Sequence, residues 1–417
     1  MVSGVESCRM ETPLMDAILV LNAGSSSIKF ALFDRADGSD AIGGGERLRG
    51  QIDGIGDAPH FQARTPDGAV VADEAVALDE AGGAGGENPH ERAIATLLDF
   101  IERFDPGLVV SAVGHRVVHG GPDFARPLRL DDAAIRTLEG FVPLAPLHQP
   151  HNLAGVRAAT RAFSAAEQVA CFDTAFHRRQ PWVADTFALP RHYYDDGVRR
   201  YGFHGLSYDY ITRYLKRAHP DLAEGRVVVA HLGNGASLCA IRDGRAMGST
   251  MGFTAVDGMP MGTRTGQLDP GVILYLMAEK GLGQAEIERL IYKESGLLGL
   301  SGISGDWRRL EEAGSGPAAE AMAYFTHRAL REIGGLAATM GGIDALVFTA
   351  GIGENAPGLR RDIGQGLGWL GLEIDPEKNA AVAEIVSTAA SSVAVLVVPT
   401  DEEAVIAHHT RELLGAG

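Results

Sequence analysis

The sequence predicts an α/β protein made of two similar halves. Residues 227–266 begin with a short β-branched strand, followed by a glycine-rich turn and a returning apolar strand. Residues 18–30 show the same order of strand, small-residue turn and strand, with Ser27 at the position of Ser237. At 417 residues, the chain is long enough for two domains with substantial cores. The repeated hairpins therefore predict two facing halves whose loops clamp a nucleotide phosphate tail.

The composition is that of an ordinary globular protein, with 45% hydrophobic and 22% charged residues. The formal net charge of −17 argues against non-specific nucleic-acid binding and against attachment to an anionic membrane surface. No apolar stretch reaches the length of a transmembrane helix. We therefore expect neither a nucleic acid nor a membrane among the partners.

The N-terminal residues and the cysteines predict a cytoplasmic protein. Residues 1–15 carry charges and lack the apolar segment of a signal peptide, so we expect a disordered extension. Cys8, Cys171 and Cys239 have no paired spacing. This scatter predicts free thiols in a reducing compartment.

Helical periodicity over 90–104 precedes an apolar strand at 108–113. Arg116 follows that strand among glycines, where α/β proteins place ligand sites. The residues alone leave two equal alternatives, because Arg116 can bind a ligand or pair with a nearby carboxylate. His115 and His119 are four residues apart, but the flanking glycines argue against a helix and hence against a metal pair.

Three further polar residues lie in loops or at strand ends. His148 lies in a loop bounded by prolines, and for this residue alone a structural role is the simpler interpretation. Asp173 ends the strand 169–172, where it either serves metal or phosphate chemistry or caps a helix. His204 lies between glycines rather than in a periodic apolar segment, which favours a functional role.

The C-terminal part continues the alternation of strands and helices. A buried strand is predicted at 345–349, before a helix, and a last strand at 393–398. Thr400 and Glu403 fit a capping box for a closing helix. The chain has no GxxxxGK[ST] loop, which excludes the P-loop class, and its glycine pattern is incomplete for a dinucleotide fingerprint.

Taken together, these motifs resemble the acetate kinase family, within the superfamily of sugar kinases, heat-shock chaperones and actin-like ATPases. They occur in the order of the family and cover nearly everything from Ile18 onward. The matching stretches are 21–27 with Lys29, 114–121, 144–148, 172–177, 201–205, 231–235, 260–264, 306–308, 351–355 and 399–402. Each motif is weak alone, whereas the ordered set is highly specific.

The resemblance implies a duplicated actin-like fold, also called ribonuclease H-like, with an active-site cleft between two domains. The N-terminal domain is expected over 16–172 plus 400–417, because the closing helix of such proteins packs back on it. The C-terminal, nucleotide-binding domain is expected over 173–399.

The resemblance also implies roles for individual residues. The catalytic positions are Arg116, His148, Asp173, His204 and Arg264. The metal positions are Asn22 and Glu402, and the substrate positions are Arg116, Val118, Leu147, Phe203 and Ala255. The nucleotide positions are Ser25, Ser27, Lys29, His231, Leu232, Gly233, Asn234, Gly235, Asp306, Trp307, Arg308, Gly351, Ile352, Gly353, Glu354 and Asn355. The glycines after the strand 345–349 are expected to lie against adenosine.

The implied reaction is the reversible, MgATP-dependent phosphorylation of acetate to acetyl phosphate by direct in-line transfer. It requires ATP as co-substrate and Mg²⁺, with Mn²⁺ as an alternative, and the family implies a homodimer. The acceptor carboxylate has a pKa of ~4–5, by analogy with side-chain carboxyls, and needs no general base. We therefore expect Asp173 to organise the magnesium shell or an arginine.

Departures from the family concern the acyl pocket. Where the family usually reads Thr-Pro-Leu-Glu-Gly, residues 254–258 read Thr-Ala-Val-Asp-Gly, and Gln267 replaces a usual aspartate. Ala255 in place of proline predicts a roomier pocket. A propionate or butyrate kinase therefore stays open as an alternative. A sugar kinase of the same fold would need a carboxylate base and no paired arginines, and an actin-like filament protein would need neither arginine.

Overall fold

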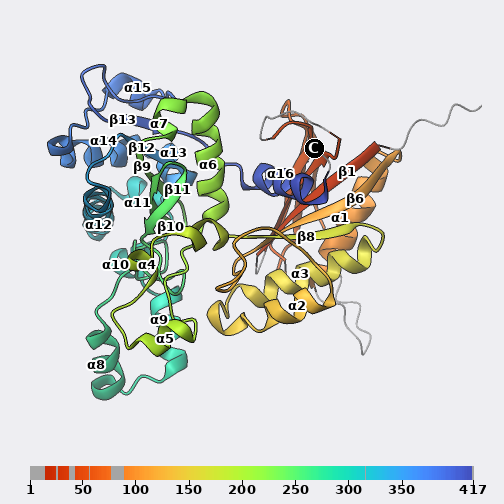
Figure 1. Ribbon diagram of the computed structural model, residues 1–417, viewed down its shortest axis with the longest axis horizontal. Coiled ribbons are helices and arrows are strands. Elements are labelled where there is room, and N and C mark those ends of the chain that lie inside the picture. Colours follow the sequence, from red (N-terminus) through yellow and green to blue (C-terminus); the bar gives the residue numbers. More distant parts are fainter. Residues whose placement is uncertain are drawn as a thin grey trace, which may run out of the picture.

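The computed structural model describes residues 15–24, 27–36, 43–55, 57–76, 89–314 and 316–415. Two halves lie side by side, each built on a β-sheet that carries helices (Figure 1). The prediction of an α/β protein with two parts is therefore confirmed. Residues 1–14 of the expected N-terminal extension lie outside the described residues, whereas Met15 is already the first residue of a strand.

The first half contains an eight-stranded sheet in the order β5-β4-β3-β2-β1-β6-β8-β7. Its strands are β1 (Met15–Ala23), β2 (Ser27–Asp34), β3 (Glu46–Asp53), β4 (His60–Arg64), β5 (Val70–Ala75), β6 (Leu108–Val117), β7 (Leu128–Arg129) and β8 (Glu167–Phe172). β1 is antiparallel to β2 and parallel to β6, and β6 is parallel to β8. The predicted hairpin at 18–30 is thus present.

The second half contains a five-stranded sheet in the order β11-β10-β9-β12-β13. Its strands are β9 (Arg226–Leu232), β10 (Ala236–Arg242), β11 (Arg245–Ser249), β12 (Ala345–Thr349) and β13 (Ala394–Val397). Asp243 and Gly244 join β10 to β11 with φ of 51° and 69°. Positive φ at both residues is typical of a two-residue hairpin turn, as the Asp-Gly pair predicts.

Each of the two sheets contains the same arrangement of five strands. In the first, an antiparallel run β3-β2-β1 is followed by the parallel strands β6 and β8. In the second, the antiparallel run β11-β10-β9 is followed by the parallel strands β12 and β13. The same order and directions in both halves are the structural form of the sequence repeat.

The central strands are apolar on both faces because each face is covered. In β1, Leu19 and Leu21 join one hydrophobic cluster, whereas Ile18 and Val20 join another on the opposite face. β9 alternates in the same way between two clusters of the second half. Continuous apolar runs are typical of strands buried on both sides.

Helices cover both sheets and connect their strands. The longer ones are α1 (Pro89–Phe104), α2 (Asp132–Glu139), α3 (Gln149–Ala162), α6 (Gly205–Ala218), α8 (Pro270–Lys280), α9 (Gln284–Lys293), α12 (Pro317–Met340), α14 (Pro357–Gly366) and α16 (Glu402–Leu414). The short ones are α4 (Trp182–Asp185), α5 (Arg191–Asp195), α7 (Pro220–Ala223), α10 (Gly296–Ser301), α11 (Trp307–Ala313), α13 (Ala350–Asn355) and α15 (Pro376–Ala380). Three 3₁₀ turns are described, at Val142–Leu144, Ala175–Arg179 and Gly368–Leu370.

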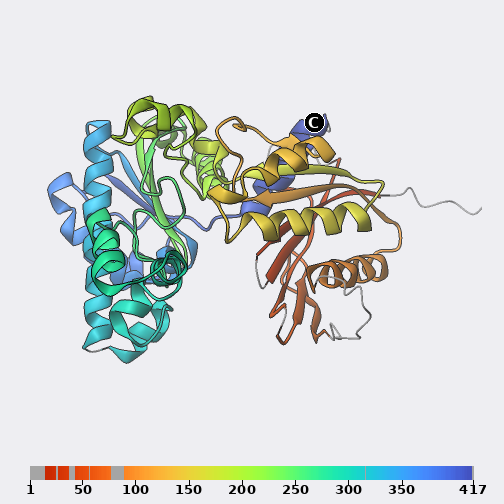
Figure 2. The same ribbon diagram turned by 90° about the horizontal axis from the view of Figure 1, so that it is seen from below.

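The last helix, α16, returns from the second half to the first sheet (Figure 2). Ala404 and Ile406 of this helix are buried with strand residues of β1. Its N-cap is Asp401, whose carboxylate accepts a hydrogen bond from Ala404 N at 2.9 Å. The predicted capping box at Thr400 and Glu403 is therefore wrong by one residue, because aspartate offers the capping oxygen directly.

Two other boundaries differ from the sequence predictions. β6 extends to Val117, so Arg116 lies within the strand rather than in a loop beyond it. Pairing with β8 explains the extension, since Arg116 lies opposite Cys171 in the parallel ladder. Gly351 to Asn355 belong to α13 itself rather than to a loop before a helix.

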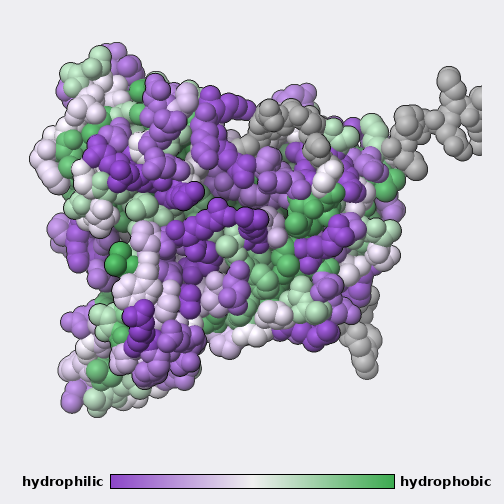
Figure 3. All heavy atoms as spheres, in the orientation of Figure 1, coloured by the Kyte–Doolittle hydropathy of each residue, from purple (hydrophilic) through white to green (hydrophobic). Residues whose placement is uncertain are grey.

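The domain limits at 16–172 plus 400–417 and at 173–399 stay predictions. Among the described residues, no helix has the length and apolar character that a membrane crossing requires. On the face shown in Figure 3, hydrophilic side chains gather along the junction of the two halves.

Gly114→Ala tests how α16 is seated on β6. A Cβ at Gly114 would lie 2.6 Å from Ile406 Cγ2 and 2.6 Å from Thr410 Oγ1. We expect a loss of about 1–3 kcal/mol in the free energy of unfolding, as for other overpacked sites, measured by urea denaturation. Gly335→Ala is the matched control, because no atom lies within 4 Å of its added Cβ in α12. That control should be neutral or more stable by ~0.5–1 kcal/mol. Equal stability of both variants would contradict this packing.

Candidate active site

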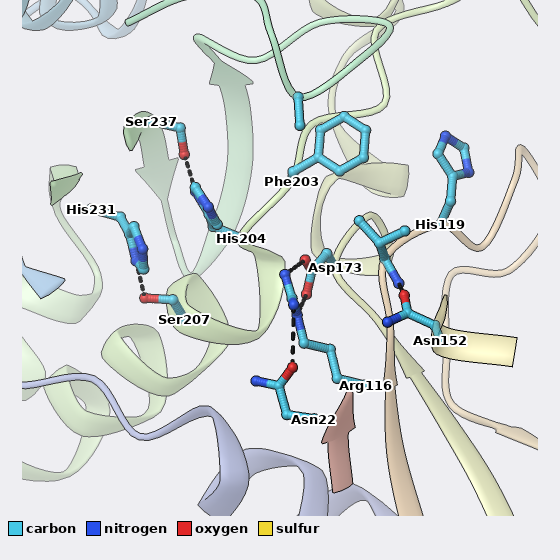
Figure 4. Close-up of polar contacts among 12 residues, drawn as sticks. Asn22, Arg116, His119, Asn152, Asp173, Phe203, His204, Ser207, His231 and Ser237 are labelled. Carbon is cyan, nitrogen blue, oxygen red and sulfur yellow. Dashed lines mark hydrogen bonds and ion pairs between the residues drawn. The ribbon is translucent and has the colours of Figure 1, made fainter. Parts of the chain in front are cut away.

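Arg116 and Asp173 lie at the centre of the site, at the ends of the neighbouring strands β6 and β8. The guanidinium donates through Nη2 to Asp173 Oδ2 at 2.6 Å and through Nε to Oδ1 at 3.1 Å (Figure 4). Asp173 is 1% exposed. Both carboxylate oxygens are therefore engaged by the arginine, and the helix-capping alternative for Asp173 is wrong. The sequence left open whether Arg116 meets a carboxylate, and in the structure it does.

Two further polar side chains adjoin this pair. Arg116 Nη1 donates to Asn22 Oδ1 at 3.2 Å, near the end of β1. Glu402 is the first residue of α16. Burial raises the pKa of Glu402 to about 7, while nearby Arg116 opposes the rise and Asp173 adds to it. Among the described residues, Glu402 has no ion-pair partner.

The oxygen donors here fit a magnesium ion that is shared with a phosphate ligand. Mg²⁺ takes oxygen ligands and is usually held by one or two carboxylates together with substrate phosphates. Glu402 supplies an unpaired carboxylate, and Asn22 supplies an amide oxygen close to the same arginine. In the part of the chain that the structure describes, no group of three or more His, Cys, Asp or Glu residues forms a metal site. The side chains are thus suited to a partial shell.

His204 occupies an unusual backbone conformation at the start of α6. Its φ of 56° and ψ of 26° are left-handed, which costs a residue with a side chain roughly 1–2 kcal/mol. Gly202 and Gly205 make this turn sterically accessible. A Cβ on Gly202 would lie 2.5 Å from the His177 ring, and one on Gly205 would lie 2.2 Å from the Asp173 carbonyl oxygen. The predicted functional histidine is therefore held beside Asp173.

The His204 ring lies partly buried against strands β9 and β10 of the second sheet. Its Nδ1 lies 2.8 Å from Ser237 Oγ, and its ring stacks on His231 with centroids 4.1 Å apart (Figure 4). His231 Nδ1 in turn lies 2.9 Å from Ser207 Oγ. Burial lowers the pKa of His204 well below its ordinary value, and His231, Arg116 and Arg264 lower it further. The ring is therefore neutral at neutral pH.

Arg264 comes from the loop after β11 and faces His204. Its Nη1 donates to the Ala255 carbonyl at 3.1 Å. A Cβ on Gly235 would lie 3.2 Å from His204 Nε2 and 3.9 Å from Arg264 Nη1. The absence of a side chain at Gly235 thus leaves space between His204 Nε2 and Arg264 Nη1.

A small apolar recess lies beside these donors. Its volume is about 10 Å³, roughly that of one water molecule. The four predicted acyl-pocket residues line it together with His148, joined by residues that the sequence analysis did not single out. The lining residues are Val118, Leu144, Ala145, Pro146, Leu147, His148, Phe203, Thr254, Ala255 and Tyr292.

Hydrogen bonds hold one wall of the recess, and His148 is neutral. Val118 N donates to Asn152 Oδ1 at 2.9 Å, and Asn152 Nδ2 donates to the Ala23 carbonyl at 2.6 Å. Burial lowers the pKa of His148 to about 4, and Arg264 and Arg116 lower it further. The residues that line the recess therefore carry no positive charge.

The predicted nucleotide segments meet around the turn between β9 and β10. Gly262 N donates to the Asn234 carbonyl at 3.2 Å. A Cβ on Gly262 would lie 2.3 Å from Asn234 Oδ1 and 3.0 Å from the Gly305 carbonyl, which directly precedes Asp306. A Cβ on Gly233 would lie 3.9 Å from Gly351 N. Backbone of all three segments is therefore brought to one edge of the second sheet.

Some predicted nucleotide residues cannot present their side chains there. Leu232 is 0% exposed, and Trp307 packs its ring against Phe325 in the core of the second half. Ile352 packs against the same core, and Gly353 is buried. Their positions contribute backbone or packing, because an apolar side chain next to a buried strand is drawn into the core.

Other predicted positions are polar and accessible. Asp306 caps α11 by accepting from Arg308 N at 2.9 Å, and its carboxylate pairs with the Arg308 guanidinium at 3.1 Å. Asn355 Nδ2 donates to the Gly351 carbonyl at 2.9 Å. Burial raises the pKa of Glu354.

The first glycine-rich turn is described only in part. Ser25 lies outside the described residues. The Ser27 carbonyl accepts a hydrogen bond from Gly24 N at 2.8 Å. Lys29 is exposed on β2 and is close enough to Glu402 to oppose the rise of its pKa. The structure therefore places Lys29 at the same edge as the Asn22 and Glu402 pair.

Four polar residues of the site carried no assigned role from sequence. They are Asn152, Ser207, Tyr208 and Ser237. The available signal for Ser237 was its match to Ser27 in the internal repeat. Their roles depend on partners far away in the sequence.

A larger cavity of about 630 Å³ lies elsewhere, between α6, α16 and the turn before β11. Four arginines line it, namely Arg126, Arg179, Arg213 and Arg245. None of the predicted site residues does so. Volume alone therefore does not identify the site.

Known proteins are similar to this chain over nearly its whole length. A model of the Acetokinase family matches residues 17–408. The chain is 52% identical over 400 residues to an acetate kinase of Methylocella silvestris, covering 95% of this chain and 98% of that protein. It is 49% identical over 402 residues to an acetate kinase of Rhizobium meliloti, covering 96% and 99%.

Two solved structures of kinases are also similar to this chain. The Porphyromonas gingivalis acetate kinase is 36% identical with a TM-score of 0.83, covering 96% of this chain and 100% of that one. A propionate kinase from Francisella tularensis is 32% identical with a TM-score of 0.85, covering 95% and 100%. On the family match and these identities over nearly the whole chain, this protein belongs to the acetokinase family.

Proposed function

We propose that this protein is an acetate kinase, which transfers the γ-phosphoryl group of ATP reversibly and directly to acetate. The observation that carries the proposal is the meeting of Arg116, His204 and Arg264 beside a recess of methyl size and next to the glycine turn at Gly235. Family membership supports the same activity.

The acceptor is a carboxylate rather than a hydroxyl. A sugar hydroxyl needs a general base to remove its proton, whereas acetate, with a pKa of ~4–5, is already ionised. Both Asp173 oxygens accept hydrogen bonds from Arg116, so this carboxylate holds the arginine instead of receiving a proton. Two arginines near the acceptor position suit an anion. These contacts favour acetate over a sugar.

The donors around the cleft suit the transferred phosphoryl group. Phosphoryl transfer relies on positioning and charge neutralisation more than on covalent chemistry. Arg116 and Arg264 offer planar guanidinium groups to carboxylate and phosphoryl oxygens, and neutral His204 offers one ring N–H. Burial strengthens each of these contacts because water competes less.

Asn22 and Glu402 are the residues that would hold Mg²⁺, with Lys29 close by. When bound, such an ion would neutralise charge on the phosphate groups. Mn²⁺ is an alternative, since it also accepts oxygen ligands. For ATP, the backbone around Gly233, Asn234 and Gly351 supplies a surface without side-chain obstruction.

The apolar recess is the acyl pocket in this proposal. Val118, Leu147, Phe203 and Ala255 surround a space that accommodates little more than a methyl group. A propionate kinase shares the fold closely, so propionate is the second candidate substrate. The small recess favours acetate.

A homodimer is also part of the proposal. Helix α8 has no buried residues within the chain, and its apolar side chains are exposed. These side chains are Val272, Leu274, Tyr275 and Met277. Such an apolar surface is typical of a protein–protein interface. A cytoplasmic location stays a prediction from the sequence.

Trapping acyl phosphate with hydroxylamine tests the activity directly. The purified protein is incubated with MgATP and a panel of carboxylates and sugars, and the hydroxamate is quantified. We expect strong signal with acetate, weaker signal with propionate and none with glucose. ATP consumption with a sugar, without hydroxamate from any carboxylate, would contradict the proposal.

Arg116→Lys and Arg264→Lys test the two guanidinium groups. Lysine keeps the charge but loses the planar fork that binds two oxygens at once. We expect each substitution to lower kcat on the order of 10²–10³-fold, as for loss of a transition-state donor. Arg361→Lys is the matched control, because its side chain is 61% exposed and pairs with Asp362 on the same helix. If a lysine variant kept a kcat near the wild-type value, the proposed role of that arginine in phosphoryl transfer would be wrong.

Ala255→Pro tests the acyl pocket. The Ala255 N–H has no acceptor among the described residues, so proline removes no hydrogen bond there. One methylene is worth ~1–3 kcal/mol in an apolar pocket, so wild-type kcat/KM for propionate should trail that for acetate by about 10–200-fold. Added ring carbons at position 255 should widen this ratio while the KM for ATP stays nearly unchanged. An unchanged ratio would show that Ala255 does not face the acyl group.

A further inference from the structure

We propose that Ser237 and Tyr208 are positioning residues that hold His204 in the tautomer protonated at Nε2, with that N–H directed at the transferred phosphoryl group. The proposal rests on the proposed phosphoryl transfer for its function, whereas the tautomer itself is a property of the free protein. It assigns a task to two residues that no sequence motif had singled out.

The three side chains form one buried chain of contacts. Tyr208 OH lies 2.5 Å from Ser237 Oγ, and Ser237 Oγ lies 2.8 Å from His204 Nδ1. Tyr208 and Ser237 are each 0% exposed. Water therefore has no access to this chain, and each hydrogen must be placed by the protein groups themselves.

Counting donors and acceptors selects one arrangement. Tyr208 OH has Ser237 as its partner and no other in the described part of the chain. Its phenolic hydrogen is satisfied only if Tyr208 donates to Ser237 Oγ. Ser237 Oγ has no other acceptor within reach among the described residues, so its own hydrogen is paired only if it points to His204 Nδ1, which then accepts and carries no hydrogen. A hydrogen on Nδ1 would leave either the phenolic or the serine hydrogen buried and unpaired, at a cost of about 1–3 kcal/mol.

The opposite ring nitrogen faces the cleft. A Cβ built on Gly235 would lie 3.2 Å from His204 Nε2, and the same point is 3.9 Å from Arg264 Nη1. With Nδ1 occupied as an acceptor, the neutral ring carries its hydrogen on Nε2. His204 is therefore a donor beside Arg264, at the glycine turn where a phosphate can approach.

The surroundings keep the ring neutral. Burial lowers the pKa of the ring, and Arg116, Arg264, His231 and His177 lower it further. A neutral imidazole has one donor, so the identity of the protonated nitrogen decides whether His204 can donate into the cleft at all.

The chain of contacts joins the first turn of α6 to strand β10. Tyr208 follows His204 by one helical turn in α6, with Tyr208 N donating to the His204 carbonyl at 3.1 Å. Ser237 lies in β10 directly opposite His231 of β9. The left-handed backbone of His204 therefore keeps its ring within hydrogen-bond distance of Ser237, and Tyr208 contacts the same serine.

The test is ¹⁵N NMR of the full-length protein with labelled histidine. Signals lost in His204→Gln are assigned to His204, and the shifts of its two nitrogens report which one carries hydrogen. We expect Nε2–H in the wild type and a mixture of tautomers in Ser237→Ala, because no hydroxyl then donates to Nδ1. Nδ1–H in the wild type would overturn the proposal.

Kinetics supply the second readout. Tyr208→Phe should lower kcat on the order of tenfold, about the worth of one hydrogen bond, with the KM for ATP nearly unchanged. Ser237→Ala should lower it further, and the double variant should resemble Ser237→Ala because both act through one chain. Tyr210→Phe on the same helix is the control and should leave kcat and the tautomer unchanged, since Tyr210 has no hydrogen bond to Ser237.

The two readouts separate this proposal from the proposed function. An Nε2–H tautomer in a protein that makes no acyl phosphate would leave the positioning intact and refute the acetate kinase activity. An active enzyme whose Ser237→Ala variant keeps both tautomer and kcat would refute the positioning alone.

Discussion

Arg116 and Asp173 sit on adjacent parallel strands, and the two hydrogen bonds between them organise the cleft. The arginine also contacts Asn22, which ties β1 to the same centre. Removing one partner of a buried ion pair costs ~3–5 kcal/mol, because the other charge stays in a poorly hydrated position. Asp173 therefore acts on the arginine by orienting it. An oriented guanidinium needs little reorganisation when an anion arrives.

Glycine controls how closely the other parts approach that centre. Gly205 lets α6 begin against the Asp173 carbonyl, and Gly202 permits the tight turn beside His177. Gly235 leaves open the space between His204 and Arg264. The resulting site is a set of backbone turns in near contact, with a few long side chains reaching between them. Adding a Cβ at these points would separate elements that the chemistry needs together.

The duplicated sheet gives the cleft its two sides. Each half has a β-hairpin followed by parallel strands. The central strands of both halves are apolar on both faces. α16 begins at Glu402 and packs on the first sheet, although it follows β13 of the second. One short segment thus links the two cores and carries a carboxylate of the site. Movement of either half relative to the other would change the distance from Glu402 to the glycine turn between β9 and β10.

The sequence by itself determined the α/β class, the repeated hairpins and the family, because these follow from local periodicity, turn chemistry and the order of motifs. It also named Arg116, Asp173, His204 and Arg264. Only the tertiary structure decided their partners, such as the Asp173 carboxylate that lies 57 positions from Arg116 along the chain. The same holds for the chain from Tyr208 to His204 and for the burial of Trp307. Such contacts depend on which strands and helices meet in space, and local pattern carries no information on that.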